Sequence, residues 1–155
     1  MARISHFRDE YAFLSNFYPC EIDHRGRHYM SVEAAYQASK CLDWHLGAQF
    51  ESLSPPEARK LGRKIPLRPD WEKEKDRIMR VLIQATFMGN HDLQSKLLQT
   101  GDAELVEENT WHDNHFGNCI CSKCADVPGE NVLGKELMRI REKLRKKNYY
   151  EGEIL

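Results

Sequence analysis

The sequence predicts a mainly α-helical protein: one compact domain over residues 1–155, with a small β-hairpin and short strands near the N-terminus. The chain of 155 residues is close to the roughly 100–150 residues that single domains most often have. Apolar residues recur at helical spacing in several segments after residue 31. Strand-like sequence is confined to the first thirty residues, and there is no internal repeat or low-complexity linker.

The hairpin is expected from Cys20–Asp23 and Arg27–Met30, joined through His24-Arg25-Gly26, where the glycine allows a positive φ. Ser31 follows directly and is placed to cap a helix over residues 32–42. The chain is therefore expected to change from strand to helix at this serine.

Four more helices are expected downstream. Ser54-Pro55-Pro56-Glu57 forms a capping box that opens a helix ending near Gly62. Asp70 precedes a long helix that ends at Gly89, and apolar residues such as Val81 outside its main stripe predict burial on most faces. The remaining two are a short helix over 91–99 and a last helix over 131–147, which carries Leu133, Leu137, Ile140 and Leu144 on one stripe.

Composition excludes several classes of protein. Hydrophobic residues make up 41% and charged residues 30%, which excludes a disordered chain, and no apolar run approaches the roughly 20 residues needed to span a bilayer. The N-terminus lacks a secretory signal, so we expect a cytoplasmic protein. The net charge of −1 shows no overall basic excess for nucleic acid. The basic segment Lys135–Lys147 is either a solvated face or an attractor for a phosphorylated ligand.

Glu33, Gln37 and Lys40 share one face of the first expected helix, because they are spaced i, i+4, i+7. Spacing alone favours an exposed polar face; the alternative is a pair of charged groups that bracket a sugar-sized ligand. The helix dipole suits Glu33 to an anionic role, and Lys40 becomes a nucleophile only where burial lowers its pKa.

The stretch from Glu108 to Glu130 has no periodicity and is too long for an ordinary loop, so it is a candidate active region. In it, Trp111 is suited to stacking on a flat heterocycle and Asp113 to acid–base chemistry. The alternative, equally supported by the sequence, is a core aromatic residue and a carboxylate that fixes the loop.

The same stretch contains Cys119, Cys121 and Cys124, three of the five cysteines. With His112 or His115 they have ligand types that zinc uses, but a second C-x-x-C is missing, so the sequence favours reduced structural cysteines. There is no P-loop and no G-x-G-x-x-G, which speaks against ATP-driven and Rossmann redox chemistry.

Six collinear blocks resemble the NADAR (YbiA-like) family over nearly the whole chain. The first four blocks are Phe13–Pro19, Ser31–Ala38 with Lys40, Leu61–Arg63 and Arg68–Trp71. The fifth is Leu97–Asp102 with Leu105, Glu107 and Asn109, and the sixth consists of Gly129, Asn131, Leu133-Gly134, Leu137-Met138 and Arg141. The resemblance implies a mainly helical fold and an N-glycosidase that splits a ribose C1–N bond. It implies as substrates either phosphoribosylamino-pyrimidine intermediates of riboflavin synthesis or ADP-ribosylated guanine.

The resemblance also implies residue roles. Glu33 matches the acidic position regarded as catalytic, and Lys40 a lysine that can form a Schiff base with the ribose C1. Trp111 and Asp113 fall in the second active-site block, and Asn16 in the first. Two departures stand out: Phe116 occupies a position where many members have Trp, and Cys119–Cys124 lies outside the general pattern.

We therefore expect Glu33, Lys40 and Asp113 to be catalytic and no metal or other cofactor to be required. The substrate contacts are expected from Asn16, Gln37, Arg63, Arg68, Trp111 and Asn131, with the arginines holding phosphate. Nucleic acid is expected only as a modified substrate. The alternatives are a module that binds ADP-ribose or nucleotides without cleaving them, and a small zinc-bearing nucleic-acid binder.

Overall fold

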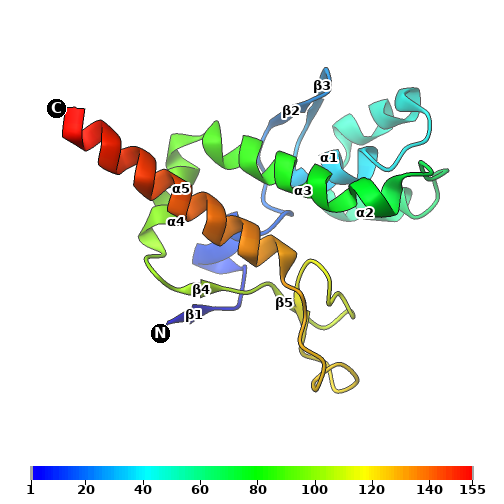
Figure 1. The fold of residues 1–155 in the computed structure, drawn as a ribbon. Coiled ribbons are helices and arrows are strands. Elements are labelled where there is room, and N and C mark those ends of the chain that lie inside the picture. Colours follow the sequence, from blue (N-terminus) through cyan, green and yellow to red (C-terminus); the bar gives the residue numbers. More distant parts are fainter. Residues whose placement is uncertain (1, 155) are drawn as a thin grey trace. The chain divides into compact units, whose positions relative to one another are not determined.

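The computed structural model describes residues 2–154, and the side chains of residues 2–148. It is mainly helical with few short strands, which confirms the predicted fold class (Figure 1). Its contacts form two units, one of residues 16–86 and one that joins the chain up to Ser15 with the chain from Phe87. The organisation as one domain stays a prediction.

The unit of residues 16–86 begins with the predicted hairpin. Strands β2 (Ile22–His24) and β3 (Arg27–Tyr29) pair antiparallel, with Ile22 opposite Tyr29. The turn is the pair Arg25-Gly26, and both residues have positive φ, +53° and +80°. This conformation matches the tight turns that two-residue hairpins favour.

Helix α1 (Val32–Ala38) is shorter than predicted. It starts at the expected cap, where the Ser31 hydroxyl accepts a hydrogen bond from the Ala34 amide at 3.1 Å. It does not continue to residue 42, because the chain turns at Ser39-Lys40 and then pairs with a later segment. In that pairing the Leu42 amide donates to the Pro66 carbonyl and the Arg68 amide to the Lys40 carbonyl.

All seven residues of α1 are buried, so the expectation of an exposed polar face is wrong. The helix contacts α2 (Pro55–Gly62), the 3-10 helix η2 (Trp44–Ser52) and the β2–β3 hairpin. The predicted capping box at the start of α2 is present, with Ser54 and Glu57 bonded reciprocally. Neighbours on several sides therefore cover α1, including its polar residues.

The long helix α3 (Trp71–Met88) ends just before Gly89, as expected. The predicted burial on most faces is wrong at Val81, which is 43% exposed, whereas Met79 and Ile83 are buried. The helix thus has one broad buried face and one solvent face, as a surface helix does.

The other unit contains two short parallel strand pairs that the sequence did not predict. Strand β1 (Arg3–Ile4) lies beside β4 (Glu104–Leu105), and β5 (Glu108–Asn109) beside β6 (Asn118–Cys119). A 3-10 helix, η1, follows β1 at Asp9–Leu14. The β1–β4 pair ties the N-terminal end of the chain to a strand that contacts α5, and the β5–β6 pair joins two parts of the long segment after residue 107.

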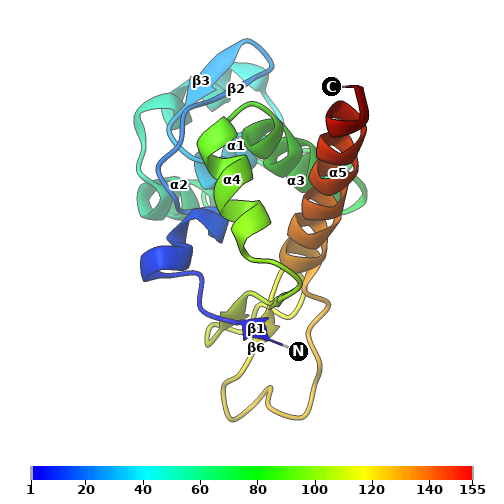
Figure 2. The same ribbon diagram turned by 90° about the vertical axis from the view of Figure 1, so that its left-hand side faces the viewer.

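Helices α4 (His91–Gln99) and α5 (Val132–Ile154) pack against each other in this unit (Figure 2). The stripe predicted for α5 is confirmed, since Leu133, Leu137, Ile140 and Leu144 are all buried. The helix runs beyond the predicted end at residue 147. None of the helices described for residues 2–154 is both long and apolar enough to cross a membrane.

Candidate active site

Glu33 is a buried carboxylate held by groups from two helices. Its side chain is 6% exposed, and its Oε1 accepts a hydrogen bond from Gln37 Nε2 at 2.8 Å. The same oxygen accepts from Arg59 Nε on α2 at 3.3 Å, and the two residues form an ion pair. Because burial of a charge is costly without such partners, this arrangement keeps an anion inside the unit in one position.

Gln37 fixes this position at a cost. Its Oε1 is buried and has no hydrogen-bond partner among the described atoms. It lies directly over Gly62 of α2, where an added Cβ would come within 1.9 Å of it. An unsatisfied buried acceptor costs about 1–3 kcal/mol, and such groups in native proteins call for an explanation. Here the explanation is that the amide is used to orient the Glu33 carboxylate.

Lys40 lies in the turn after α1 and not on the helix itself. Its ammonium lies 5.9 Å from the centroids of the Tyr36 and Trp71 rings, which pack at 5.0 Å from each other. Burial lowers the pKa of Lys40, and the nearby Arg59 and Arg63 add to the effect, while Glu33 opposes it. A lysine with a lowered pKa is suited to nucleophilic catalysis because more of it is the neutral amine.

The arginines near this centre differ in their availability. Arg59 stacks over the Phe17 ring at 4.5 Å in addition to pairing with Glu33. Arg63 is exposed, and among the described residues it forms no ion pair. Arg68 instead pairs through two nitrogens with the Asp70 carboxylate, at 2.6 and 2.9 Å. Arg63 is therefore the better placed of the two predicted arginines to meet a phosphate.

Asn16 also belongs to this part of the chain. Its backbone carbonyl accepts from the Glu33 amide at 3.1 Å, and its Nδ2 contacts the Met79 sulfur at 3.3 Å. The Asn16 backbone thereby fixes the first turn of α1, where Glu33 lies. The structure thus brings Asn16, Glu33, Gln37 and Lys40 into one unit with Arg59 and Arg63.

A hollow of about 310 Å³ opens in the same unit beside the end of α1. It is lined by Arg27, Trp44 and Arg68 among others. The buried Arg27 guanidinium stacks on the Trp44 ring at 3.6 Å and donates to the Trp44 carbonyl. Glu33 and Lys40 do not line this hollow, so we do not place the chemistry there.

The predicted residues Trp111, Asp113 and Asn131 lie in the other unit. Trp111 is 56% exposed and borders a hollow of about 230 Å³ together with Phe7 and Ile120. The expectation of a core aromatic residue is therefore wrong, because the indole lies at the surface.

Asp113 and Asn131 are engaged by backbone groups of their own unit. Asp113 Oδ1 accepts from the amides of His115 and Phe116, at 3.0 and 2.9 Å. The Asn131 side chain accepts from the Glu107 amide at 3.1 Å and donates to the Leu105 carbonyl at 2.9 Å. Both side chains thus fix the loop and the start of α5, and their roles toward a substrate stay predictions.

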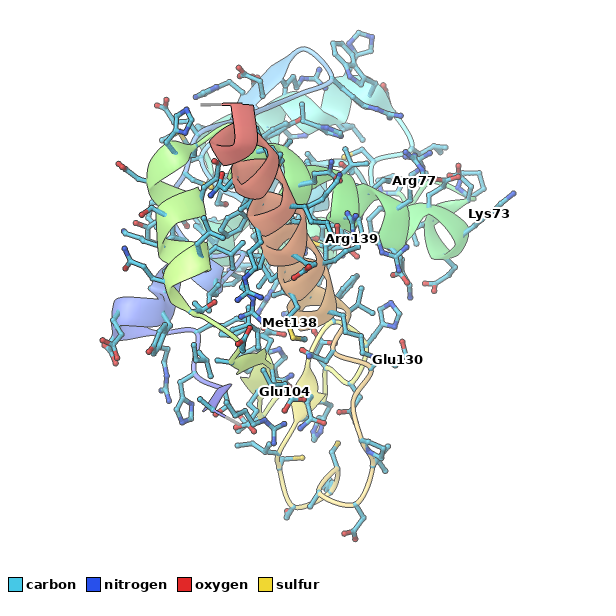
Figure 3. The ribbon with its side chains drawn as sticks, turned by 60° about the vertical axis from the view of Figure 1, so that its left-hand side comes forward. Lys73, Arg77, Glu104, Glu130, Met138 and Arg139 are labelled. Carbon is cyan, nitrogen blue, oxygen red and sulfur yellow. The ribbon has the colours of Figure 1, made fainter. Side chains whose placement is uncertain are left out.

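Three arginines of α5 have partners within their own unit. Arg139, labelled on this helix in Figure 3, bonds the Glu136 carboxylate. Arg141 donates to the Thr100 hydroxyl at 2.8 Å, and Arg145 pairs with Asp102 at 3.0 Å. The last two contacts hold α5 to the turn after α4, which is a structural use of these arginines.

With this geometry established, comparison with known proteins decides the family. The model of the NADAR domain matches residues 4–145. The chain belongs to the NADAR family. It is 36% identical over 141 residues to the N-glycosidase YbiA of Escherichia coli, covering 88% of this chain and 83% of that protein. The NMR structure of E. coli YbiA matches with a TM-score of 0.79 at 31% identity, covering 96% of this chain and 88% of that one.

Two further relatives carry informative names. The N-glycosidase Npun_R5314 of Nostoc punctiforme is 37% identical, covering 87% of this chain and 86% of that protein. The riboflavin biosynthesis protein VVA0006 of Vibrio vulnificus is 34% identical over 88% of this chain, which spans only 36% of that protein. The prediction of a NADAR-type enzyme of the N-glycosidase class is confirmed at the level of the family.

The sequence did not reveal three parts of the site. Arg59 pairs with Glu33, Gly62 makes room for Gln37, and Trp71 packs near Lys40, all from helices after α1. Gly62 and Trp71 lie in blocks that resemble the family pattern. Arg59 had no such signal, because only the packing of α2 on α1 brings it to the carboxylate.

Proposed function

We propose that this protein hydrolyses the C1–N bond between a ribose and a base in a phosphorylated riboside, with Glu33 and Lys40 as its catalytic residues. The observation that carries the proposal is the buried Glu33 carboxylate, held by Gln37 and Arg59 in the unit that also contains a lysine of lowered pKa. The names of the relatives support the same class of reaction.

The chemistry explains why a fixed carboxylate is needed. Breaking the ribosyl C1–N bond develops positive charge on the sugar, and a preorganised anion stabilises that charge. A carboxylate that is already oriented does not have to reorganise during the reaction. Gln37 and Arg59 supply this orientation at Glu33.

Lys40 supplies a covalent route. In the ring-opened sugar its neutral amine adds to C1, the C1–N bond to the base breaks, and the base nitrogen takes up a proton. The resulting Schiff base is hydrolysed by water, which returns the free amine and leaves the oxygen of water on C1. The net reaction consumes one water and gives a free sugar and a base carrying N–H.

A phosphorylated sugar suits the charges around this centre. Arg63 is exposed and close enough to Lys40 to lower the pKa of its ammonium. A phosphate bound by Arg63 would place the sugar toward the carboxylate, and Arg forks bind phosphate well. Arg68, already paired with Asp70, is the weaker candidate for this contact.

Two substrate classes fit the proposal. The name of the Vibrio relative favours phosphoribosylamino-pyrimidine intermediates of riboflavin synthesis. ADP-ribosylated guanine, free or in nucleic acid, is the second class and rests on the family resemblance. The roles of Trp111 in stacking on the base and of Asp113 in proton transfer rest on that resemblance too. A cytoplasmic location is inferred from the sequence alone.

A mass-spectrometric screen tests the proposal. The protein is incubated with a panel of ribosides from both classes, beside the Glu33→Gln variant. The expected result is a free base with ribose phosphate or ADP-ribose from the wild-type protein only. Tight binding of a riboside that stays intact would instead support a binding module without catalysis.

A further inference from the structure

Four metal-binding side chains converge in the segment between β5 and α5. They are His112, Cys119, Cys121 and Cys124, and their ligand atoms all lie within 4.8 Å of one another. The segment forms the long loop at the foot of Figure 2, with β6 inside it. Three sulfurs and one imidazole nitrogen are a common ligand set of structural zinc sites.

The distances fit a tetrahedral ion. His112 Nδ1 lies 3.3 Å from the sulfur of Cys121, 3.4 Å from that of Cys124 and 4.0 Å from that of Cys119. With Zn–S bonds of about 2.3 Å and Zn–N bonds of about 2.0–2.1 Å, a tetrahedral ion places the nitrogen about 3.5–3.6 Å from each sulfur. The average of the three distances falls at this value, so little movement is needed to bind the ion.

The loop is built to bring the histidine to the cysteines. Asn109 Oδ1 accepts from the amides of Trp111 and Asp113, so it clamps the backbone on both sides of His112. His112 itself has a φ of +69°, a left-handed conformation that few residues other than glycine adopt. Such strain is typical of positions that function requires.

The cysteines are positioned from the other side. Asn114 Oδ1 accepts from the Cys119 amide at 2.8 Å, and Cys119 pairs with Asn109 in the β5–β6 ladder. A tight turn, in which the Cys124 amide donates to the Cys121 carbonyl at 3.1 Å, brings the last two sulfurs together. Each ligand is thus placed by hydrogen bonds that do not involve the ligand atoms.

We propose that His112 Nδ1 and the thiolates of Cys119, Cys121 and Cys124 bind one Zn²⁺ ion. On binding, the three thiols release three protons to solvent, and the loaded site carries a net charge of −1. Four protein ligands fill all four positions of the tetrahedron, so the ion is structural and leaves no position for a substrate or water. The exposed His112 provides the side from which the ion enters.

This inference departs from the sequence-based preference for reduced structural cysteines. The sequence lacked a second C-x-x-C, whereas the structure supplies the missing ligand from His112, seven residues before Cys119. It is independent of the proposed glycosidase activity. The ion would have a local effect: it would link His112 to the three cysteines and so hold the loop that carries Trp111 in one conformation.

Zinc content of the full chain tests the proposal. The protein is purified without metal-affinity resin under reducing conditions, incubated with zinc, freed of excess and analysed by elemental mass spectrometry. We expect one zinc per chain, a loss of that zinc in Cys121→Ser, and a weaker site in His112→Ala. The matched control Cys41→Ser removes a half-buried thiol of the other unit and should keep one zinc. The absence of stoichiometric zinc in the wild-type protein, or its full retention in Cys121→Ser, would overturn the proposal.

Thiol alkylation of the wild-type protein gives a second test that no folding defect of a variant can obscure. With zinc, Cys119, Cys121 and Cys124 should be protected from maleimide, and a chelator should expose all three. Cys20 and Cys41 should react at the same rate with and without zinc. Equal reactivity of the three cluster cysteines in both conditions would show that the cluster does not hold the ion.

Discussion

Replacing Glu33 by Gln removes one negative charge and leaves the shape of the side chain almost unchanged. The variant keeps an oxygen that can accept from Gln37 Nε2, so the hydrogen bond at 2.8 Å can persist. Under the proposed mechanism, what is lost is the anion that stabilises the developing positive charge on the sugar. Removal of one preorganised electrostatic group of this kind costs about 10²–10³ in rate, or about 2.7–4 kcal/mol of activation free energy.

The cost to stability should be much smaller. The ion-pair partner Arg59 has a side chain that is 35% exposed, so solvent screens the pair. We expect the free energy of unfolding to fall by about 1 kcal/mol, which lies between the contributions of exposed and of buried ion pairs. For a chain of this length that lowers Tm by about 2–4 °C, so the variant stays folded at 25 °C.

The assay combines single-turnover kinetics on the cleaved riboside with thermal unfolding of the same samples. The matched control is Glu72→Gln, which removes an exposed carboxylate paired with Lys75 on α3 and should leave the rate unchanged. A Glu33→Gln variant that cleaves within about twofold of the wild-type rate would refute the role of Glu33, since a factor of two is only about 0.4 kcal/mol.

Four further predictions concern the same unit. Because burial lowers the pKa of Lys40, the cleavage rate should rise with pH through that lowered pKa. Borohydride should trap a sugar adduct on the wild-type enzyme, and Lys40→Arg should abolish this adduct. An adduct that persists in the variant would exclude Lys40 as the nucleophile. The folded-state pKa of Lys40 lies below its ordinary value of 10.5, so the unfolded chain binds more protons between the two values, and the free energy of unfolding should rise with pH there in the wild type but not in Lys40→Met. Gly62→Ala should displace the Gln37 amide and lower kcat about tenfold to a hundredfold. This is the effect expected when a hydrogen bond to a charged group, worth about 1.5–3 kcal/mol, is lost. An unchanged kcat would show that the Gln37 amide does not position the Glu33 carboxylate. Ser54→Ala should cost about 1 kcal/mol of unfolding free energy without a change in KM, whereas Ser52→Ala, just before the cap, should cost almost nothing in denaturant titration.

The starts of helices could be predicted because local signals set them. Ser31 and the Ser54 capping box bind the first amides of α1 and α2 as their sequence positions require. The end of α1 could not be predicted, since no glycine or proline stops the helix there. Backbone bonds of the following residues to Pro66 and Arg68, far along the chain, end the helix instead.

The strand pairs were invisible for a related reason. Each strand of the β1–β4 and β5–β6 pairs has two residues, and each pair is parallel. A two-residue strand has no alternation to detect, and its partner lies outside the window of any local pattern. The sequence could show only that residues 108–130 lack helical periodicity.

The candidate site was predicted in its residue types but not in its environment. Spacing placed Glu33 and Gln37 on one face of a helix, which the structure bears out. Their burial depends on Arg59 and Gly62 of α2, which no spacing within α1 can reveal. In the same way, the sequence offered His112 or His115 beside the cysteine cluster, and only the structure, which places His112 next to the sulfurs, decides between them.

Turnover in ¹⁸O-labelled water tests the central claim, cleavage at the ribose C1–N bond, most directly. The products are separated and weighed by mass spectrometry. We predict a released base that keeps its ring-attached nitrogen and carries no ¹⁸O, together with a free sugar phosphate. A base that gains ¹⁸O or loses that nitrogen would place the attack on the base and contradict the proposed role of Glu33 and Lys40.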